Sequence, residues 1–137
     1  MIINNRNLLA DGAPKTTLSS AVAAGATVYP VANTSAFTTS YAIQIGETAS
    51  DQSEVLIGTV TNVGTITGAA SNFPHPADTP VYNLKFDQVV FERSTAGTAG
   101  TATPMTNGTI TYQADSLQTV FDDTSGSASY SYRTYFK

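Results

Sequence analysis

The stretch Asn72–Arg93, NFPHPADTPVYNLKFDQVVFER, decides how the rest of the chain is organised. It holds three of the six prolines and the only histidine, and it ends in the longest apolar-rich run. The alternating apolar residues up to Phe86 share one parity, whereas Val89 and Phe91 have the opposite parity. Such a change of phase predicts a β-bulge or a crossing between sheets near Asp87–Gln88. We therefore predict a domain boundary at Asp87, with the preceding proline-rich segment acting as a stiff hinge.

Short β-prone segments separated by turn residues precede this stretch. In the segment 54–60, Val55 and Ile57 are expected to share the buried face because they alternate with polar residues. Asn62 and Gly64 tolerate the positive φ of a tight turn, which predicts a hairpin between the segments on either side. No segment has apolar residues at helical spacing with caps, so the predicted class is all-β with little helix.

The residues after the stretch continue the β pattern. Ser94–Gly108 is rich in Thr, Ala and Gly and is expected to be a long loop. Strands are predicted over 109–112 and 116–121, followed by a turn at 122–126. In the last segment, Tyr130, Tyr132 and Phe136 alternate with polar residues, which predicts one aromatic core face.

The chain divides, on this interpretation, into an N-terminal arm (1–15), a first β domain (16–86) and a second β domain (87–137). The arm is expected either to fray or to fold on a neighbouring subunit. A domain of about 60 residues buries only about 60% of its unfolded surface. Two β domains of this size therefore favour a partner or self-assembly.

Composition narrows the classes of partner. Charged residues make up 12% of the 137 residues, about half the usual quarter, and the net charge is −4. Three Lys and three Arg are spread thinly, so no basic patch exists for nucleic acid. There is no cysteine, which excludes disulfides and thiolate chemistry and fits a reducing compartment. With no signal-peptide pattern or membrane-length apolar run, we expect a soluble protein made in the cytoplasm.

Few residues suggest chemistry. His75 lies between two prolines and close to Asp78, but a catalytic triad also needs a positioned nucleophile, and no Gly-X-Ser-X-Gly elbow occurs. We expect His75 to anchor its loop by packing against Tyr82. The sequence thus predicts no catalytic, cofactor-binding or metal site, and no cofactor.

The acidic residues form two groups along the sequence, for which solvated turns are the favoured interpretation. A glycosidase pair or a calcium site would need carboxylates at a defined separation, and the EF-hand spacing is absent. The two groups are Glu47, Asp51 and Glu54, and Asp122 with Asp123.

The first half contains a set of short motifs: AGAT at Ala24–Thr27, IGE at Ile45–Glu47, SE at Ser53–Glu54, HPA at His75–Ala77 and TPVY at Thr79–Tyr82. Together they resemble a small β-barrel-like domain of tailed-bacteriophage structural proteins. In that family an AGAT start, an IGE strand followed by SE, and an HPA and TPVY exit recur.

The second half resembles a shortened fibronectin-type-III or Ig-like sandwich of the kind appended to phage head, neck and tail proteins. It lacks the buried Trp, and the chain ends where a closing strand would follow, so we expect that strand to be missing or supplied by another subunit. The resembling segments are Phe86–Ser94, Ile110–Ser116, Thr119–Asp123 and Tyr130–Phe136.

This resemblance implies a non-enzymatic virion structural protein: a capsid decoration or accessory protein, or a head-neck-tail component. Its expected partners are major capsid, neck or tail subunits and further copies of itself in a homo-oligomer, and its expected location is the virion, after synthesis in the host cytoplasm. Two alternatives remain. One is an Ig-like module that presents Ser94–Gly108 to host-surface glycans, and the other is a carbohydrate-active enzyme that uses Asp122 or Asp123.

Overall fold

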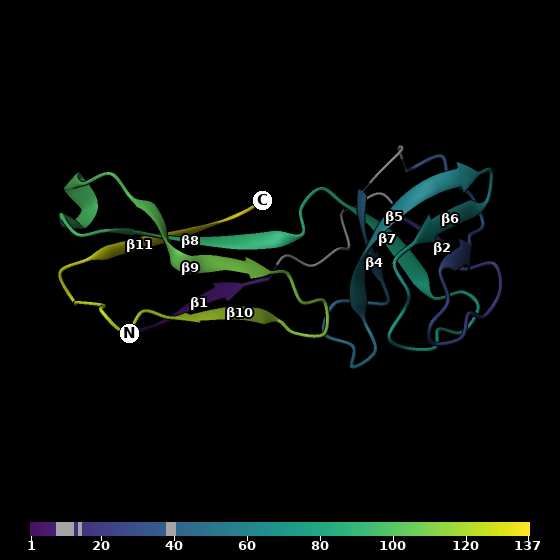
Figure 1. The fold of residues 1–137 in the computed structure, drawn as a ribbon, viewed down its shortest axis with the longest axis horizontal. Coiled ribbons are helices and arrows are strands. Elements are labelled where there is room, and N and C mark those ends of the chain that lie inside the picture. The colour runs from purple at the N-terminus through teal and green to yellow at the C-terminus, as the bar shows by residue number, and fades with distance from the viewer. Residues whose placement is uncertain (8–12, 14, 38–40) are drawn as a thin grey trace. The chain divides into compact units, whose positions relative to one another are not determined.

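Two separate β units make up the chain in a computed structural model, which describes residues 1–7, 13, 15–37 and 41–137. The first unit consists of residues 8–85 and 113–117, and the second of residues 1–7, 86–112 and 118–137 (Figure 1). The described residues contain no α-helix, only a single-turn 3₁₀ helix at Gly97–Ala99. Nothing in this part of the chain is a helix with the length and apolar character needed to cross a bilayer. The all-β prediction is confirmed.

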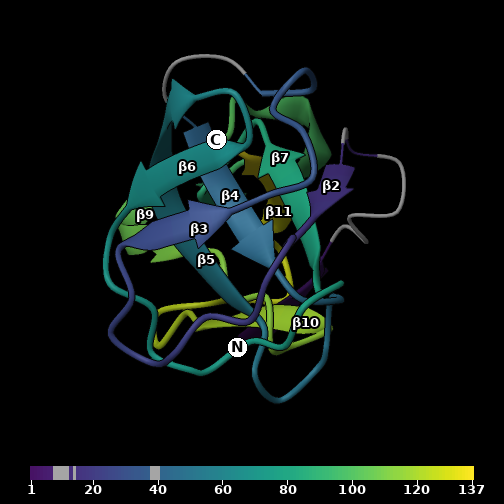
Figure 2. The same cartoon turned by 90° about the vertical axis from the view of Figure 1, so that its right-hand side faces the viewer.

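The first unit is built on one six-stranded antiparallel sheet that curls round on itself (Figure 2). Just beyond its two edge strands, Leu18 and Val31 form an antiparallel bridge. Ser19 N donates to the Pro30 carbonyl, and Ala32 N donates to the Thr17 carbonyl, both at 2.9 Å. Together these contacts link the two ends of the sheet into a small barrel. In sheet order, the strands are β2 (Lys15–Thr17), β7 (Pro80–Leu84), β4 (Tyr41–Ile45), β5 (Glu54–Asn62), β6 (Thr65–Gly68) and β3 (Val28–Pro30).

Apolar side chains from every part of this sheet fill the barrel. Tyr29 is fully buried, and its hydroxyl donates to the carbonyls of Ala26 at 2.8 Å and Ala69 at 2.5 Å. A buried polar group needs such partners, because an unpaired one costs free energy. The other members of the cluster are Leu18, Val22, Val31, Phe37, Ile43, Ile45, Leu56, Ile66 and Val81.

The buried face of β5 is the opposite of the one predicted. Glu54 and Leu56 are buried, whereas Ile57 is 54% exposed. The prediction was wrong because it placed an ionisable residue outside, and hydrogen bonds within the barrel hold this carboxylate inside. The predicted hairpin is confirmed, since β5 and β6 pair in antiparallel fashion and Gly64 has φ +79°.

The proline-rich segment belongs to the first unit and is not a hinge. Val22 and His75 exchange two backbone hydrogen bonds of 2.9 Å, and Leu18 N donates to the Thr79 carbonyl at 2.9 Å. Pro80 is the first residue of β7. The chain leaves this sheet at Leu84 and enters a different sheet at Gln88, so the predicted crossing near Asp87–Gln88 is confirmed.

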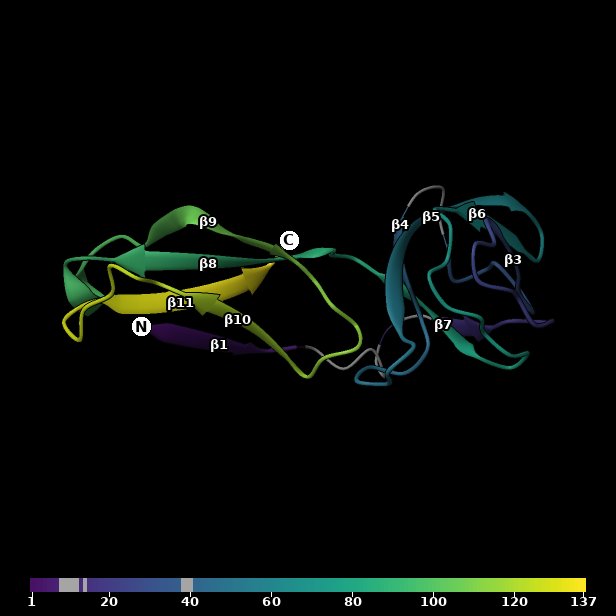
Figure 3. The same cartoon turned by 60° about the horizontal axis from the view of Figure 1, so that its bottom comes forward.

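Two small sheets that face each other form the second unit (Figure 3). Phe91 and Phe121, one from each sheet, stack with ring centroids 5.5 Å apart. Thr134 Oγ1 also donates across to Asn5 Oδ1 at 2.6 Å. One sheet has the order β11 (Ser131–Phe136), β8 (Gln88–Ser94), β9 (Thr103–Thr111), and the other pairs β1 (Ile2–Arg6) with β10 (Gln118–Asp122).

The N-terminal residues are a strand of this sandwich and not an arm. Strand β1 pairs with β10 of its own chain, from Ile2 opposite Asp122 to Arg6 opposite Gln118. The expected arm over 1–15 is therefore wrong for residues 1–7, and residues 8–12 and 14 lie outside the described part. The small sheet thus takes its second strand from its own chain.

The predicted aromatic face of the last strand is confirmed. Tyr132, Thr134 and Phe136 are half-buried, whereas Tyr135 is 43% exposed. Phe136 packs against Phe86 with a centroid distance of 4.6 Å. Such close aromatic pairs contribute beyond the area they bury.

Candidate functional site

A cavity of about 600 Å³ lies at one end of the second unit. One side is formed by Thr103, Met105 and Asn107 of β9, and the other by Phe121 and the segment 122–125 at the end of β10. Arg93 of β8 also lines it. The structure therefore brings together two features that the sequence singled out separately, the 94–108 segment and the pair Asp122 and Asp123.

An irregularity in β9 shapes this cavity. Val90 lies opposite Thr109 and Glu92 lies opposite Pro104, so residues 105–108 are all placed across from Phe91. A bulge of this kind breaks the ladder and redirects side chains. Asn107, within it, has φ +59°, a left-handed conformation that Asn adopts more readily than most residues.

The expected loop at Ser94–Gly108 is therefore partly wrong. Strand β9 begins at Thr103, and a short 3₁₀ turn precedes it. A sequence rich in Thr and Gly carries little hydrophobic alternation, which explains why the strand was not predicted.

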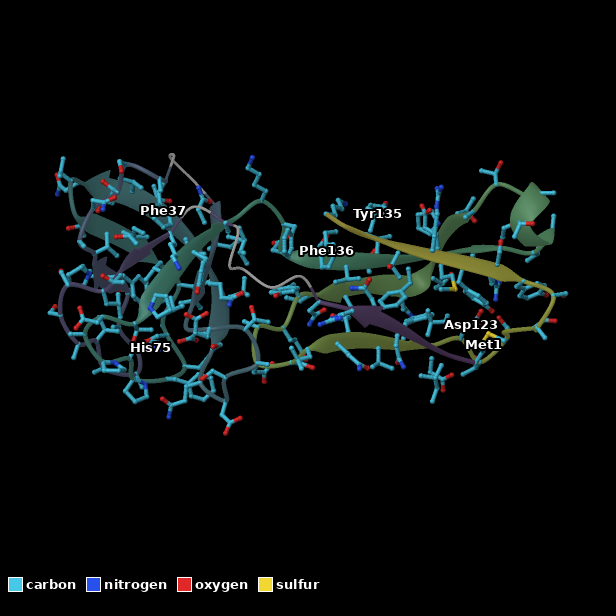
Figure 4. The ribbon with its side chains drawn as sticks, turned by 180° about the vertical axis from the view of Figure 1, so that it is seen from behind. Met1, Phe37, His75, Asp123, Tyr135 and Phe136 are labelled. Carbon is cyan, nitrogen blue, oxygen red and sulfur yellow. The ribbon has the colours of Figure 1, made fainter. Side chains whose placement is uncertain are left out.

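Asp123 is the polar centre of the site (Figure 4). Its two carboxylate oxygens accept hydrogen bonds from Arg93 Nη1 at 3.0 and 2.8 Å. Ser125 donates to Oδ1 through its backbone N–H at 3.1 Å and its hydroxyl at 2.9 Å. Tyr132 donates its hydroxyl to Oδ2 at 3.1 Å. The carboxylate thus accepts hydrogen bonds from three parts of the chain.

These contacts determine the charge state of the site. Burial opposes ionisation of Asp123, but the hydrogen bonds from Arg93, Ser125 and Tyr132 outweigh it and lower its pKa to about 2. The same hydrogen bond to Asp123 raises the pKa of Arg93. Burial, followed by the hydrogen bond to the carboxylate, raises the pKa of Tyr132. The site therefore holds a stable ion pair at neutral pH.

The low pKa of Asp123 makes this residue poorly suited to act as a general acid. A general acid needs a pKa near the working pH, and Asp123 is ionised far below it. Asp122 and Asp123 are adjacent at the end of an extended strand, where successive side chains point to opposite faces. Accordingly, Asp123 is buried and Asp122 is exposed. The hydroxyl, amide and guanidinium groups that line the cavity can form hydrogen bonds with a ligand.

A second polar cluster lies inside the first unit around Glu54. Its Oε1 lies 2.8 Å from His75 Nε2, and its Oε2 accepts from the backbone and side-chain N–H groups of Asn72 at 2.8 and 3.0 Å. Glu54 and His75 are both buried. The cluster ties β5 to the proline-rich segment, so its role is structural.

The pairing of His75 with Glu54 was not predicted from the sequence. Tyr82 donates its hydroxyl to Glu47 Oε2 at 2.5 Å, and Asp78 is exposed with φ +67°. No spacing rule pairs Glu54 with His75, because they are joined across the barrel and not along one element.

The other acidic residues of the first sequence group, Glu47 and Asp51, have different surroundings. Asp51 is exposed, and Glu47 is held by Tyr82. Within the described ranges, no three His, Asp or Glu side chains lie close enough together to hold a metal ion.

No protein-family model, no curated protein and no solved structure matches the chain.

Proposed function

We propose that this chain is a non-enzymatic structural component of a tailed-phage particle, either a capsid decoration or accessory protein or a head-neck-tail protein. The observation that carries the proposal is the outer surface of the second unit. Ile2 of β1, 68% exposed, and Val120 of β10, 51% exposed, are diagonal neighbours on the outward face of the β1–β10 sheet, and Tyr135 of β11 is 43% exposed on the other sheet. Apolar side chains gathered on one exposed face are typical of contact surfaces.

The character of the surrounding surface supports contact by packing and not by charge. Only 12% of the residues are charged, so exposed strands are lined mainly with hydroxyl and methyl groups. Strands with little charge at their edges associate readily with other chains. The resemblance of the motifs from Ala24–Thr27 to Thr79–Tyr82 to those of phage structural proteins supports a particle as the place of contact, with capsid, neck or tail subunits as the proposed partners.

A pair of matched substitutions tests the proposal in particles. Val120→Glu places a charge on the exposed face of β10, whereas Val63→Glu places the same charge on the hairpin turn of the barrel, where Val63 is 96% exposed. Each tagged variant is expressed during infection, and its amount in gradient-purified particles is compared with its amount in the lysate. We expect Val120→Glu to lower incorporation and Val63→Glu to leave it unchanged.

Absence of the unsubstituted chain from purified particles would contradict the proposal. Equal incorporation of both variants would show that the contact surface is elsewhere. Circular dichroism of the purified variants checks that both fold.

The cavity beside Asp123 favours a second candidate function, binding of host-surface glycans. Its volume lies within the range of about 300–1,000 Å³ that ligand pockets occupy. Thr103 and Asn107 supply hydroxyl and amide groups, and Phe121 supplies an aromatic surface. Among the described residues, Arg93 donates to Asp123 and Ser125 through Nη1, which leaves Nε and Nη2 for sugar hydroxyls.

A glycan array followed by titration of the retained glycans tests this function. Thr103→Val removes a hydroxyl that lines the cavity, and Thr109→Val removes one from the same strand outside it. Glycan binding should weaken in the first variant and persist in the second. A flat array, or equal affinity of both variants, would count against a site here.

A further inference from the structure

We propose that β1 is an exchangeable strand, which pairs with β10 of a second copy of this chain as well as with β10 of its own. The inference rests on the topology and contacts of the second unit alone, and it holds whether or not the protein belongs to a phage particle.

Three segments of the chain make up the second unit: 1–7, 86–112 and 118–137. Strand β1 precedes all the strands of the first unit, β2 to β7, whereas the other strands of the second unit, β8 to β11, follow them. Because the strands of another unit separate β1 from β10 along the chain, β1 can pair equally well with β10 of its own chain or with β10 of a second chain. Exchange of one such element between identical subunits is a low-cost route to association.

Main-chain and polar contacts hold β1 in place. Its backbone pairs with β10 over five residues, and Asp123 N also donates to the Met1 carbonyl at 2.8 Å. On its inward face Asn5 and Asn7 are buried. Asn7 Oδ1 accepts from Thr119 Oγ1 at 2.7 Å, and Asn5 Oδ1 accepts from Thr134 at 2.6 Å.

Apolar burial contributes less to the attachment of this strand. Ile3 is half-buried, and Ile2 is largely in water. Separation of β1 therefore exposes little hydrophobic surface on the strand itself. It also leaves the backbone hydrogen-bonding groups of β10 without partners, and β1 of another copy can satisfy them. A second copy supplies the same five-residue ladder and the same two asparagine contacts, so exchange conserves every interaction.

The segment between β1 and the barrel sets how far β1 can reach. Eight residues, 7–14, separate Arg6 from Lys15, and at 3.3–3.6 Å per residue they span up to roughly 26–29 Å. Reciprocal exchange gives a closed dimer, whereas one-way exchange gives an open chain of subunits that can grow.

Cysteine substitutions provide a direct test because the natural chain has none. Asn4 and Val120 are opposite each other in the β1–β10 register, and both are exposed. Met1 and Asp123 exchange two hydrogen bonds, so alternation along the ladder makes Asn4 and Val120 a non-hydrogen-bonded pair. The Cα separation of about 4.5 Å in such a pair is compatible with a disulfide.

The experiment mixes Asn4→Cys chains with Val120→Cys chains, either as folded proteins or by unfolding and refolding them together, and then oxidises them. Mass spectrometry measures the mixed disulfide dimer. The control mixes Asn4→Cys with Val63→Cys, which reports random collisions of exposed thiols. We expect a several-fold excess of the Asn4–Val120 dimer over the control, increasing with protein concentration.

The doubly substituted chain, Asn4→Cys with Val120→Cys, checks the register itself. We expect it to form the disulfide, partly within one chain and partly between two. A disulfide found exclusively within single chains, together with mixed dimers no more abundant than the control by either route, would overturn the proposal. Failure of the double variant to form any disulfide would overturn it as well, because the pairing on which exchange depends would then be absent.

Discussion

Removal of the Glu54 side chain should destabilise the first unit severely. Glu54→Ala deletes the acceptor of three hydrogen bonds, one from His75 and two from Asn72. His75 is 3% exposed, so water cannot readily replace the lost partner. The methyl group of alanine also leaves space beside the core of the barrel.

The expected magnitude follows from the burial of this cluster. Removal of one member of a buried, hydrogen-bonded pair costs about 3–5 kcal/mol. A domain of about 80 residues has a net stability of roughly 4–12 kcal/mol, so this loss is a large part of the total. Because 1 kcal/mol corresponds to about 4–8 °C for a domain of 60–100 residues, the melting temperature should fall by roughly 12–40 °C.

Differential scanning calorimetry of the full chain measures this change. Asp51→Ala is the matched control, since it removes the same charge from an exposed position near β5 and should change stability by no more than about 0.5 kcal/mol. A loss below about 1 kcal/mol for Glu54→Ala would refute the assignment of Glu54 as a buried structural tie.

Three further changes test other parts of the structure. The pKa of Asp123 is lowered from 3.8 to about 2. The ionised carboxylate therefore stabilises the fold fully above pH 3.8, and this stabilisation is lost as the pH falls toward 2. Asp123→Asn should lower the urea midpoint clearly at pH 5 and much less at pH 2. Phe91→Ala removes a fully buried ring that stacks on β10 and should cost about 3–5 kcal/mol in urea unfolding. Tyr135→Ala, on the exposed face, should stay within about 0.5 kcal/mol. Gly64→Ala should cost about 1–2 kcal/mol by thermal unfolding, because Gly64 has φ +79°, and an equal loss for Val63→Ala would contradict that reason.

Local pattern was sufficient for several elements of the fold. The hairpin at Asn62–Gly64 depends on turn chemistry, and the aromatic face that ends in Phe136 depends on alternation within one strand. The crossing near Asp87–Gln88 could be predicted because a change in the parity of the apolar residues has few structural explanations. In each case the deciding residues are neighbours in sequence.

Long-range contacts explain what local pattern missed. Strand β1 pairs with a strand more than a hundred residues away, and its polar sequence resembles a frayed terminus. The parity of β5 was reversed because Ile57 looks more buried than Glu54 until His75 and Asn72 are placed beside the carboxylate.

The candidate site was also only partly predictable. Asp123 and the segment 94–108 were both noted in the sequence, but their juxtaposition depends on the pairing of β8 with β9 and on the bulge within it. Arg93 was not predicted to pair with Asp123, because no sequence pattern links a single Arg to a carboxylate so far away along the chain.

Counting the chain in purified particles is the sharpest test of the proposed role as a structural component of a phage particle. Trypsin cleaves after Lys85 and Arg93 and so releases FDQVVFER, residues 86–93, with which the chain returns to the second unit. An isotope-labelled copy of this peptide allows absolute quantification against the major capsid protein. We expect the peptide to migrate with the particle band at the same copy number in independent preparations. Its confinement to the soluble fractions of the lysate would rule out a structural role in the particle.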